Sequence, residues 1–323
     1  MGYKFSMDIL GMLLVVFGLI VFESISSIDN AIINADVLST MREKFRRIFL
    51  TWGLFFGVFV IRFILPWLII WLATPSLGPI NALLATFSND PAVANAIEAT
   101  APVLLIGGGV FLVFLFFDWL FLQPKSYGLV GERFIQRQGV WFFAVVAVVL
   151  TLVVWLAINR NPIMAFSAVL GSTAFFIVHG FRQNAELKEK ELMTSSLPDV
   201  SKLLYLEIID ATFSIDGVLG AFAFTLSVPL ILIGNGIGAL IVRQLTVSNI
   251  ARIKRYIYLK NGAMYSVLFL GTFMILESLG GDMPTWVAPI ATFTIIGYFF
   301  LKSRNHMKRQ SLKEEAPPQP NPA

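Results

Sequence analysis

The sequence predicts an all-α integral membrane protein with about nine transmembrane helices. Of its 323 residues, 57% are hydrophobic and only 14% are charged. The mean hydropathy of +0.77 lies beyond the range in which a soluble domain can bury its apolar residues. Apolar runs of about 20 residues, the length that crosses a bilayer, recur along most of the chain. We therefore expect a single membrane domain over residues 1–303, with the lipid bilayer as its solvent.

Nine apolar runs are long enough to be candidate spans. They cover residues 8–37, 48–74, 101–122, 139–159, 162–180, 199–227, 228–248, 258–278 and 285–302. Basic residues gather in every second connection, beginning with the group from Arg42 to Arg47, and again in the C-terminal tail. By the positive-inside rule, this alternation predicts an N-terminus outside and a C-terminus inside. The polar, proline-rich residues 304–323 predict a disordered cytoplasmic tail.

The composition also excludes several kinds of chemistry. The chain has no cysteine and only two histidines, His179 and His306, so disulfides and soft-metal sites are not expected. No pairing of serine or glutamate with histidine indicates an enzyme, and no bound cofactor is predicted. The net charge of +4 is spread over short loops and therefore indicates topology and not a nucleic-acid surface.

An internal repeat relates the two halves of the chain. Aligning residues 22–35 with 209–222 pairs Glu23 with Asp210, Ser27 with Ser214 and Asp29 with Asp216; Gly57 and Arg62 likewise match Gly238 and Arg243. Spans one and six cross in opposite directions, so the pattern predicts an inverted-topology repeat with its binding site near the midplane. The repeat units are about 8–122 and 199–278. Linker helices at about 139–180 separate them, and a last helix follows at about 285–302.

Several acidic residues lie inside the predicted spans, where each costs about 2.5–3.5 kcal/mol and therefore indicates function. The candidate metal ligands are Glu23, Asp29, Asn30, Glu207, Asp210 and Asp216, supported by Ser27, Ser214, Asn235, Arg62 and Arg243. On an ideal helix Glu23, Ser27, Asn30 and Asn34 share one face, whereas Asp29 lies off it, and Asp216 is displaced by the same angle in the second half. We therefore expect helices one and six to be broken around Ser27–Asp29 and Ser214–Asp216.

These oxygen-bearing side chains suit a hard divalent cation such as Mn²⁺, Ca²⁺ or Mg²⁺. Two roles are open for the arginines. Arg62 and Arg243 are candidate counter-charges for the acids when no cation is bound, or each pairs permanently with one acid to stabilise helix packing.

The acidic motifs resemble those of the TerC/Alx family of bacterial integral membrane proteins. The first-half element is carried by Glu23, Ser27, Asp29, Asn30 and Ala31, and the second by Glu207, Asp210, Phe213 and Asp216; the similarity continues through Asn235 and Arg243 into residues 258–271. Gly217 stands where that family commonly has serine. The resemblance implies a protein of the bacterial inner membrane, related to the lysine-exporter superfamily. It also implies a role in metal-ion homeostasis, notably manganese export, with calcium proposed for relatives, or in tellurite resistance.

The leading hypothesis is a secondary transporter that exports Mn²⁺ or Ca²⁺ through a midplane carboxylate site by exchange against protons. One alternative is a membrane scaffold, an insertion partner or a tellurium-resistance component without its own transport. Another is an exporter of organic cations or amino acids, which predicts an aromatic-lined pocket. The sequence leaves open whether the protein forms a homo-oligomer.

Overall fold

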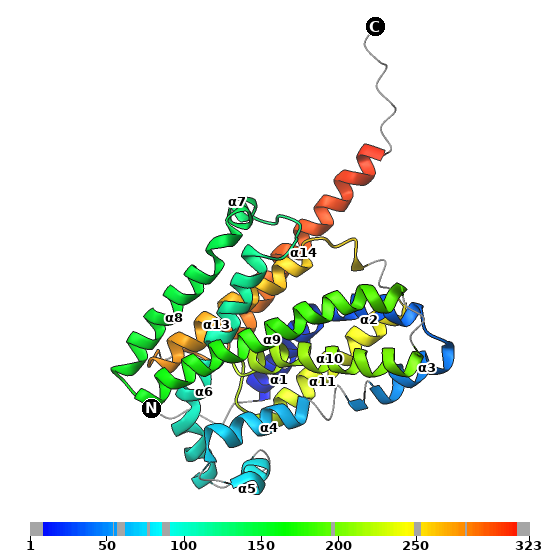
Figure 1. Ribbon diagram of the computed structural model, residues 1–323. Coiled ribbons are helices and arrows are strands. Elements are labelled where there is room, and N and C mark those ends of the chain that lie inside the picture. Colours follow the sequence, from blue (N-terminus) through cyan, green and yellow to red (C-terminus); the bar gives the residue numbers. More distant parts are fainter. Residues whose placement is uncertain are drawn as a thin grey trace.

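The computed structural model describes residues 9–53, 55–56, 62–75, 78–85, 91–194, 198–248, 253–281 and 283–314. Every regular element in these ranges is helical (Figure 1), which confirms the predicted all-α class. The main helices are α1 (Ile9–Ser26), α2 (Ile28–Ser39), α3 (Glu43–Ile48), α4 (Arg62–Ala73), α5 (Gly78–Ala85), α6 (Pro91–Phe121), α7 (Glu132–Arg137), α8 (Phe142–Ile158), α9 (Pro162–Thr194), α10 (Asp199–Ala221), α11 (Val228–Ser248), α13 (Leu259–Ser278) and α14 (Val287–Glu314).

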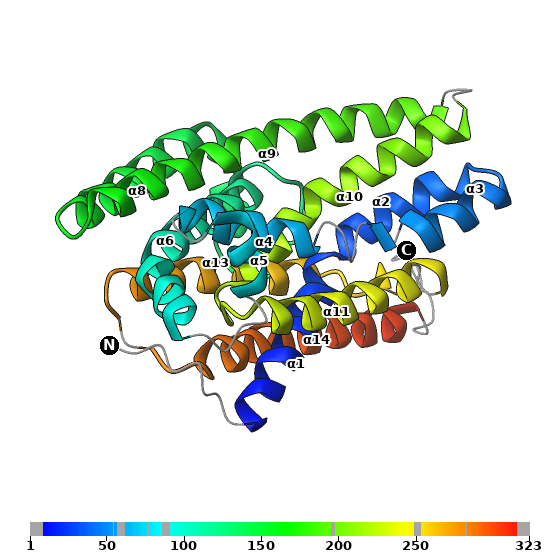
Figure 2. The same ribbon diagram turned by 90° about the horizontal axis from the view of Figure 1, so that it is seen from below.

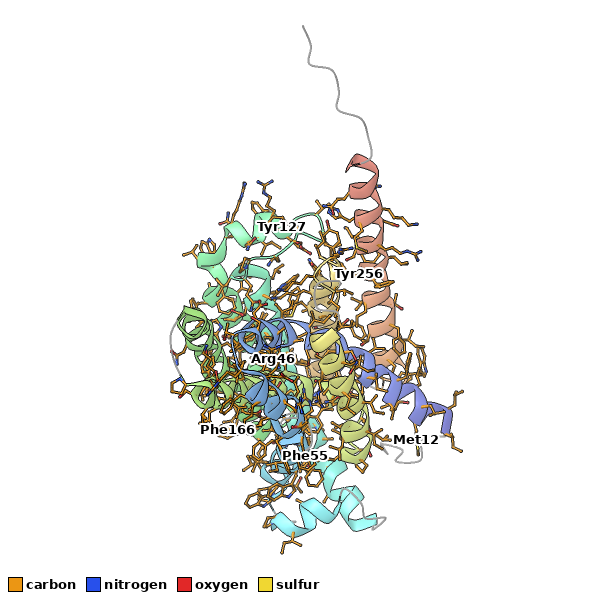
Figure 3. The ribbon with its side chains drawn as sticks, turned by 90° about the vertical axis from the view of Figure 1, so that its right-hand side faces the viewer. Met12, Arg46, Phe55, Tyr127, Phe166 and Tyr256 are labelled. Carbon is orange, nitrogen blue, oxygen red and sulfur yellow. The ribbon has the colours of Figure 1, made fainter. Side chains whose placement is uncertain are left out.

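Five helices are long and apolar enough to cross a membrane. They lie at Ile9–Ser26, Ala99–Phe121, Gly139–Ile158, Pro162–Asn184 and Leu259–Ser278. Shorter apolar helices occur at Arg62–Leu72 and Val228–Gln244. Exposed apolar side chains, among them Phe55 and Phe166, project from the outside of the bundle (Figure 3), as lipid-facing residues do. The protein is thus a helical, multi-pass membrane protein, and the total of nine spans remains a prediction.

Helix α6 forms the centre of the apolar core, and small residues bring its neighbours close. A Cβ atom on Gly171 of α9 would lie 2.0 Å from the carbonyl oxygen of Gly107, and one on Gly109 would lie 2.7 Å from that of Gly271 in α13. Such close contacts drive helix association where there is no hydrophobic effect between the helices. Glycine is therefore required where α6 meets α9 and α13.

Helices α1 and α11 pack against each other in the same way. A Cβ atom on Gly234 would lie 2.5 Å from Cβ of Leu19, and one on Gly238 would lie 2.7 Å from Cβ of Glu23. The glycine-rich run at residues 234–243 is thus a helix-packing surface. This contact places α11 directly beside the acidic end of α1.

The two predicted helix breaks have different outcomes. Helix α1 ends at Ser26 and α2 begins at Ile28, so regular geometry is interrupted at Ser27, as expected. Helix α10 instead runs without interruption from Asp199 to Ala221, so the break predicted at Ser214–Asp216 is wrong. The Ser214 hydroxyl donates to the Asp210 carbonyl at 2.7 Å, a bond that is compatible with a continuous helix.

The ends of the bundle also differ from the predicted boundaries. Helix α14 continues to Glu314, so the prediction of disorder from residue 304 is wrong as far as 314 (Figure 1). The helix can continue because the first proline of the tail is Pro317 and no glycine precedes it there. Residues 315–323 lie outside the described part.

The C-terminal end of α9, the N-terminal end of α10 and α3 lie toward one end of the molecule, and the α8–α9 connection lies at the other (Figure 2).

Candidate functional site

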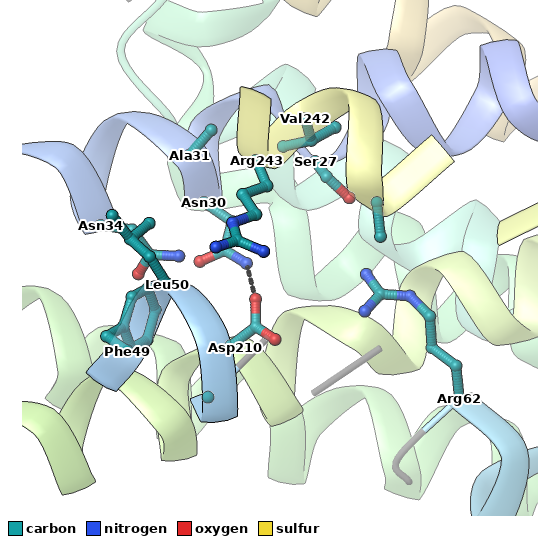
Figure 4. Close-up of a pocket in the computed structure, with 12 residues that line it drawn as sticks. Ser27, Asn30, Ala31, Asn34, Phe49, Leu50, Arg62, Asp210, Val242 and Arg243 are labelled. Carbon is teal, nitrogen blue, oxygen red and sulfur yellow. Dashed lines mark hydrogen bonds between the residues drawn. The ribbon is translucent and has the colours of Figure 1, made fainter. Parts of the chain in front are cut away.

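A small, partly open cavity of about 50 Å³ lies where α2, α4, α10 and α11 meet the π-helical turn η1 (Phe49–Gly53) (Figure 4). This space suffices for a few water molecules or a partly hydrated ion. Its lining residues are Ser27, Asn30, Ala31, Asn34, Phe49, Leu50, Gly53, Arg62, Asp210, Ala239, Val242 and Arg243. Five of the predicted site residues therefore line one space.

One wall of the cavity is formed by a polar link between α2 and α10. The amide nitrogen of Asn30 donates to Oδ1 of Asp210 at 2.6 Å. In Figure 4 the guanidinium group of Arg243 lies beside this pair, and that of Arg62 extends toward it from α4. The repeat alignment matched these two arginines, and both line the same cavity. Gly57, which the alignment matched with Gly238, lies outside the described residues.

A buried ion pair lies next to the cavity. Arg62 donates through Nη2 to Oε1 of Glu23, which also accepts a hydrogen bond of 2.8 Å from the Ser27 hydroxyl. Glu23 is fully buried and the Arg62 side chain is 4% exposed. Glycine leaves room for this carboxylate, because a Cβ atom on Gly217 would lie 2.3 Å from its Oε2. Arg62 is thus the counter-charge of Glu23 in this structure, as both hypotheses for the arginines allow.

Several buried oxygen atoms around the cavity receive no hydrogen bond from any described residue. They are Oε2 of Glu23, Oδ1 of Asn30, Oδ1 of Asn34, Oδ1 of Asn235 and both carboxylate oxygens of Glu207. A buried acceptor left without a donor costs about 1–3 kcal/mol, so these atoms are suited to accept from water or to bind a cation in this space. Asn34 was predicted to lie on the same helix face as Glu23 but was not in the predicted ligand set.

Glu207 lies on α10, one helical turn before Asp210. It contacts Gly53 so closely that a Cβ atom there would lie 1.9 Å from its Oε1. Gly53 ends the π-helical turn, a rare geometry that occurs frequently at functional sites. Glu207 therefore does not line the cavity itself, but it contacts Gly53, which does.

The comparisons with known proteins identify a family without assigning an activity. Residues 28–310 match the family model DUF475, which is described as a protein of unknown function. The chain belongs to this family. The matched range includes the cavity residues from Asn30 to Arg243 and begins after Glu23. A search of curated proteins and a search of solved structures each found no match. The resemblance to the TerC/Alx family remains a prediction for this DUF475 protein.

The structure does not bring all the predicted ligands together. Asp216 pairs with Arg182 of α9 and does not reach the cavity, because α10 is unbroken there. Asn235 is buried and donates to the Gly217 carbonyl at 3.2 Å. The side chains of Asp29 and Phe213 lie outside the described part.

Among the described side chains, no group of three acidic or histidine residues is placed to hold a metal ion. The six predicted ligands therefore do not form one shell in this conformation. The sequence gives no signal for this partner of Asp216, because Arg182 follows the predicted fifth span, among the basic residues of a connection. Only the packing of α9 against α10 shows that Arg182 reaches a buried acid.

Proposed function

We propose that this protein is a secondary transporter that exports a hard divalent cation, Mn²⁺ or Ca²⁺, through the cavity between α2, α4, α10 and α11. The observation that carries the proposal is the group of buried oxygen atoms without donors beside this cavity, on Glu23, Asn30 and Asn34. Hard cations bind carboxylate and amide oxygens, and an unfilled set of such atoms within a membrane protein suits an ion that passes through.

The charges around the cavity suggest how a cation would be accommodated. Glu23 and Asp210 supply two negative charges, and Arg62 compensates Glu23 in the described conformation. An entering divalent cation would replace Arg62 as the counter-charge of Glu23, and the guanidinium group would move aside. The donor-free Oε2 of Glu23 is the atom that the cation would meet first on this residue.

The predicted architecture of nine spans and an inverted repeat belongs to the same proposal. In such transporters the two halves rock around a central site, so that it opens to each side in turn. The cavity is lined by α2 and α4 from the first half and by α10 and α11 from the second. The interruption at Ser27 supports the proposal, since it would let α2 move relative to α1.

The proposal is tested by Mn²⁺ and Ca²⁺ flux in vesicles that contain the purified protein. We expect Glu23→Gln and Asp210→Asn to reduce the flux more than tenfold, which corresponds to about 1.4 kcal/mol. Asp36→Asn is the matched control, because Asp36 is an exposed acid on α2 that pairs with Lys254 at the surface. Equal flux from the wild type and both site variants would exclude this function. As a readout that does not need the variants to fold, Mn²⁺ should raise the melting temperature of the wild-type protein in detergent.

Export of an amino acid is a second candidate. No described residue forms an ion pair with Arg243. Its guanidinium group lies near Asp210 in the cavity (Figure 4). An arginine and an aspartate that line the same cavity would suit the carboxylate and ammonium groups of a zwitterion. Phe49 is the one aromatic residue in the described lining, so the aromatic pocket expected for organic cations is not formed. Uptake of labelled amino acids, measured in the same vesicles with and without Mn²⁺, distinguishes the two substrates.

A further inference from the structure

A second buried polar cluster lies between α6, α8, α9 and α10. Asp118 of α6 is only 4% exposed, and its Oδ1 lies 3.1 Å from Nδ1 of His179 on α9. The Gln123 amide donates to the other carboxylate oxygen at 2.7 Å. The rings of Phe142 and Phe175 stack on the imidazole of His179, with centroids 6.5 and 5.7 Å away. This histidine is therefore held between an acid and two aromatic rings inside the bundle.

The cluster is electrostatically connected to the central site. Arg182 lies one turn beyond His179 on α9 and pairs with Asp216 of α10. Asp216 interacts electrostatically with both Asp118 and Glu23. Its neighbour in the chain, Gly217, contacts the Glu23 carboxylate directly. Asp216 of the Arg182 pair is thus adjacent in the chain to the glycine that contacts Glu23 of the Arg62 pair.

Asp118 of α6 is the charged group in contact with His179, and α8 contributes the uncharged ring of Phe142. Other charged groups lie around this pair: Lys125 after α6 and Asp216 of α10 both interact with Asp118, and Arg182 of α9 pairs with Asp216. Apart from the contact with His179, Oδ1 of Asp118 has no hydrogen-bond donor in the described ranges. A proton on His179 therefore determines whether this buried carboxylate is compensated.

We propose that the Asp118–His179 pair is a proton-binding site whose occupancy opposes cation binding at the central cavity. Histidine is the side chain whose charge ordinarily changes between about pH 5 and 8. When neutral His179 takes up one proton from water it becomes an imidazolium ion, and the pair with Asp118 is then neutral overall. Release of that proton leaves the negative charge of Asp118 near Asp216 and Glu23, which favours a cation in the cavity. Such reciprocal coupling is what exchange of a cation against protons requires.

This inference rests on the proposed transport function for its biological role, but the proton site can be measured separately. Because the chain has two histidines, the His306→Gln protein labelled with ¹⁵N-histidine has a single imidazole, that of His179. We expect its NMR signals in detergent to titrate, and the midpoint to fall by about one pH unit, a tenfold loss of proton affinity, in Asp118→Asn. Saturating Ca²⁺, which is diamagnetic, should lower the midpoint as well. A signal that does not titrate, or a midpoint unchanged by either Asp118→Asn or Ca²⁺, overturns the proposal.

Transport measurements separate this inference from the function it rests on. Proton movement that accompanies Mn²⁺ flux is followed with a pH-sensitive dye in vesicles containing wild type, His179→Gln or His306→Gln. We expect His179→Gln to lose proton movement at least tenfold and to bind Mn²⁺ with an affinity that no longer falls as the pH is lowered, while His306→Gln behaves like the wild type. Unchanged proton movement in His179→Gln overturns the proton site and leaves cation transport standing. If the wild type moves no cation, the transport function fails, and the NMR titration still decides the proton site.

Discussion

The segments around Ser27 and Ser214 share an acid, three intervening residues and a Ser-Ile-Asp sequence, but only the first interrupts its helix. The difference lies in where each serine hydroxyl donates. Ser27 bonds the side chain of Glu23 at 2.8 Å, whereas Ser214 bonds the backbone carbonyl of Asp210 at 2.7 Å. Glutamate is one methylene longer than aspartate, so its carboxylate can reach the hydroxyl one turn ahead.

The acids of the two segments also have different partners. Glu23 pairs with Arg62 of α4, Asp210 accepts from Asn30 of α2, and Asp216 pairs with Arg182 of α9. Side chains of other helices thus hold both segments. Both also keep backbone hydrogen bonds, since the Ser27 N–H donates to the Glu23 carbonyl at 3.1 Å and the Ala31 N–H donates to the Ser27 carbonyl at 3.0 Å. Similar sequence patterns at the two positions thus produce a local irregularity at Ser27 and an unbroken helix at Ser214.

The largest effect is expected from removing the charge that compensates the first segment. Arg62→Gln leaves Glu23 buried without its counter-charge and should lower the free energy of unfolding by about 3–5 kcal/mol. Arg243→Gln is the matched variant on the second segment's side of the cavity. Because Arg243 forms no ion pair with a described residue, this change should lower the free energy of unfolding by less than about 1 kcal/mol. Denaturant unfolding in detergent measures both. Equal losses would contradict the asymmetry between the two arginines.

The contact between the segments can be changed through Gly217. Gly217→Ala places a Cβ atom against the Glu23 carboxylate, which Arg62 and Ser27 hold in position, and should cost about 1–3 kcal/mol. Gly297→Ala in α14 is the control, since a Cβ atom there meets nothing within 4 Å. This control should be neutral or stabilising by up to about 1 kcal/mol. A Gly217→Ala protein as stable as Gly297→Ala would show that Glu23 can move freely.

The two serines test the comparison directly. Ser27→Ala removes a hydrogen bond to a buried carboxylate and should lower the free energy of unfolding by about 1.5–3 kcal/mol. This loss should exceed that of Ser214→Ala. Ser214→Ala should change the free energy of unfolding by about 0.5 kcal/mol or less, because the Asp210 carbonyl keeps its helical hydrogen bond. A double-mutant cycle with Glu23→Gln should show coupling for Ser27 and none for Ser214. Coupling of similar size for both serines would refute the explanation given for the helix break.

The smallest effect on the free energy of unfolding is expected from Lys125, a charged residue outside both segments. Burial lowers the pKa of Lys125, in the connection after α6, from 10.5 to about 8. The unfolded chain therefore binds this proton more tightly, and the free energy of unfolding should rise as the pH rises from about 8 to 10.5. The rise stays small because Lys125 is half-buried and water screens its charge. Lys125→Met should abolish this rise, as measured by denaturant unfolding at several pH values. A rise that persists in the variant would assign it to another group.

The amino-acid sequence by itself determined the membrane class and the helical fold, and it singled out Asn30, Asp210, Arg62 and Arg243, which line the cavity. These features follow from composition, from helical periodicity and from the cost of charge in lipid, which act along a single segment. Only the tertiary structure decided that Ser27 and not Ser214 interrupts its helix, that Asp216 turns to Arg182, and that His179 lies against a buried acid. These outcomes depend on which helices lie side by side, because a long polar side chain in a low-dielectric interior pairs with the nearest partner, wherever that partner stands in the chain.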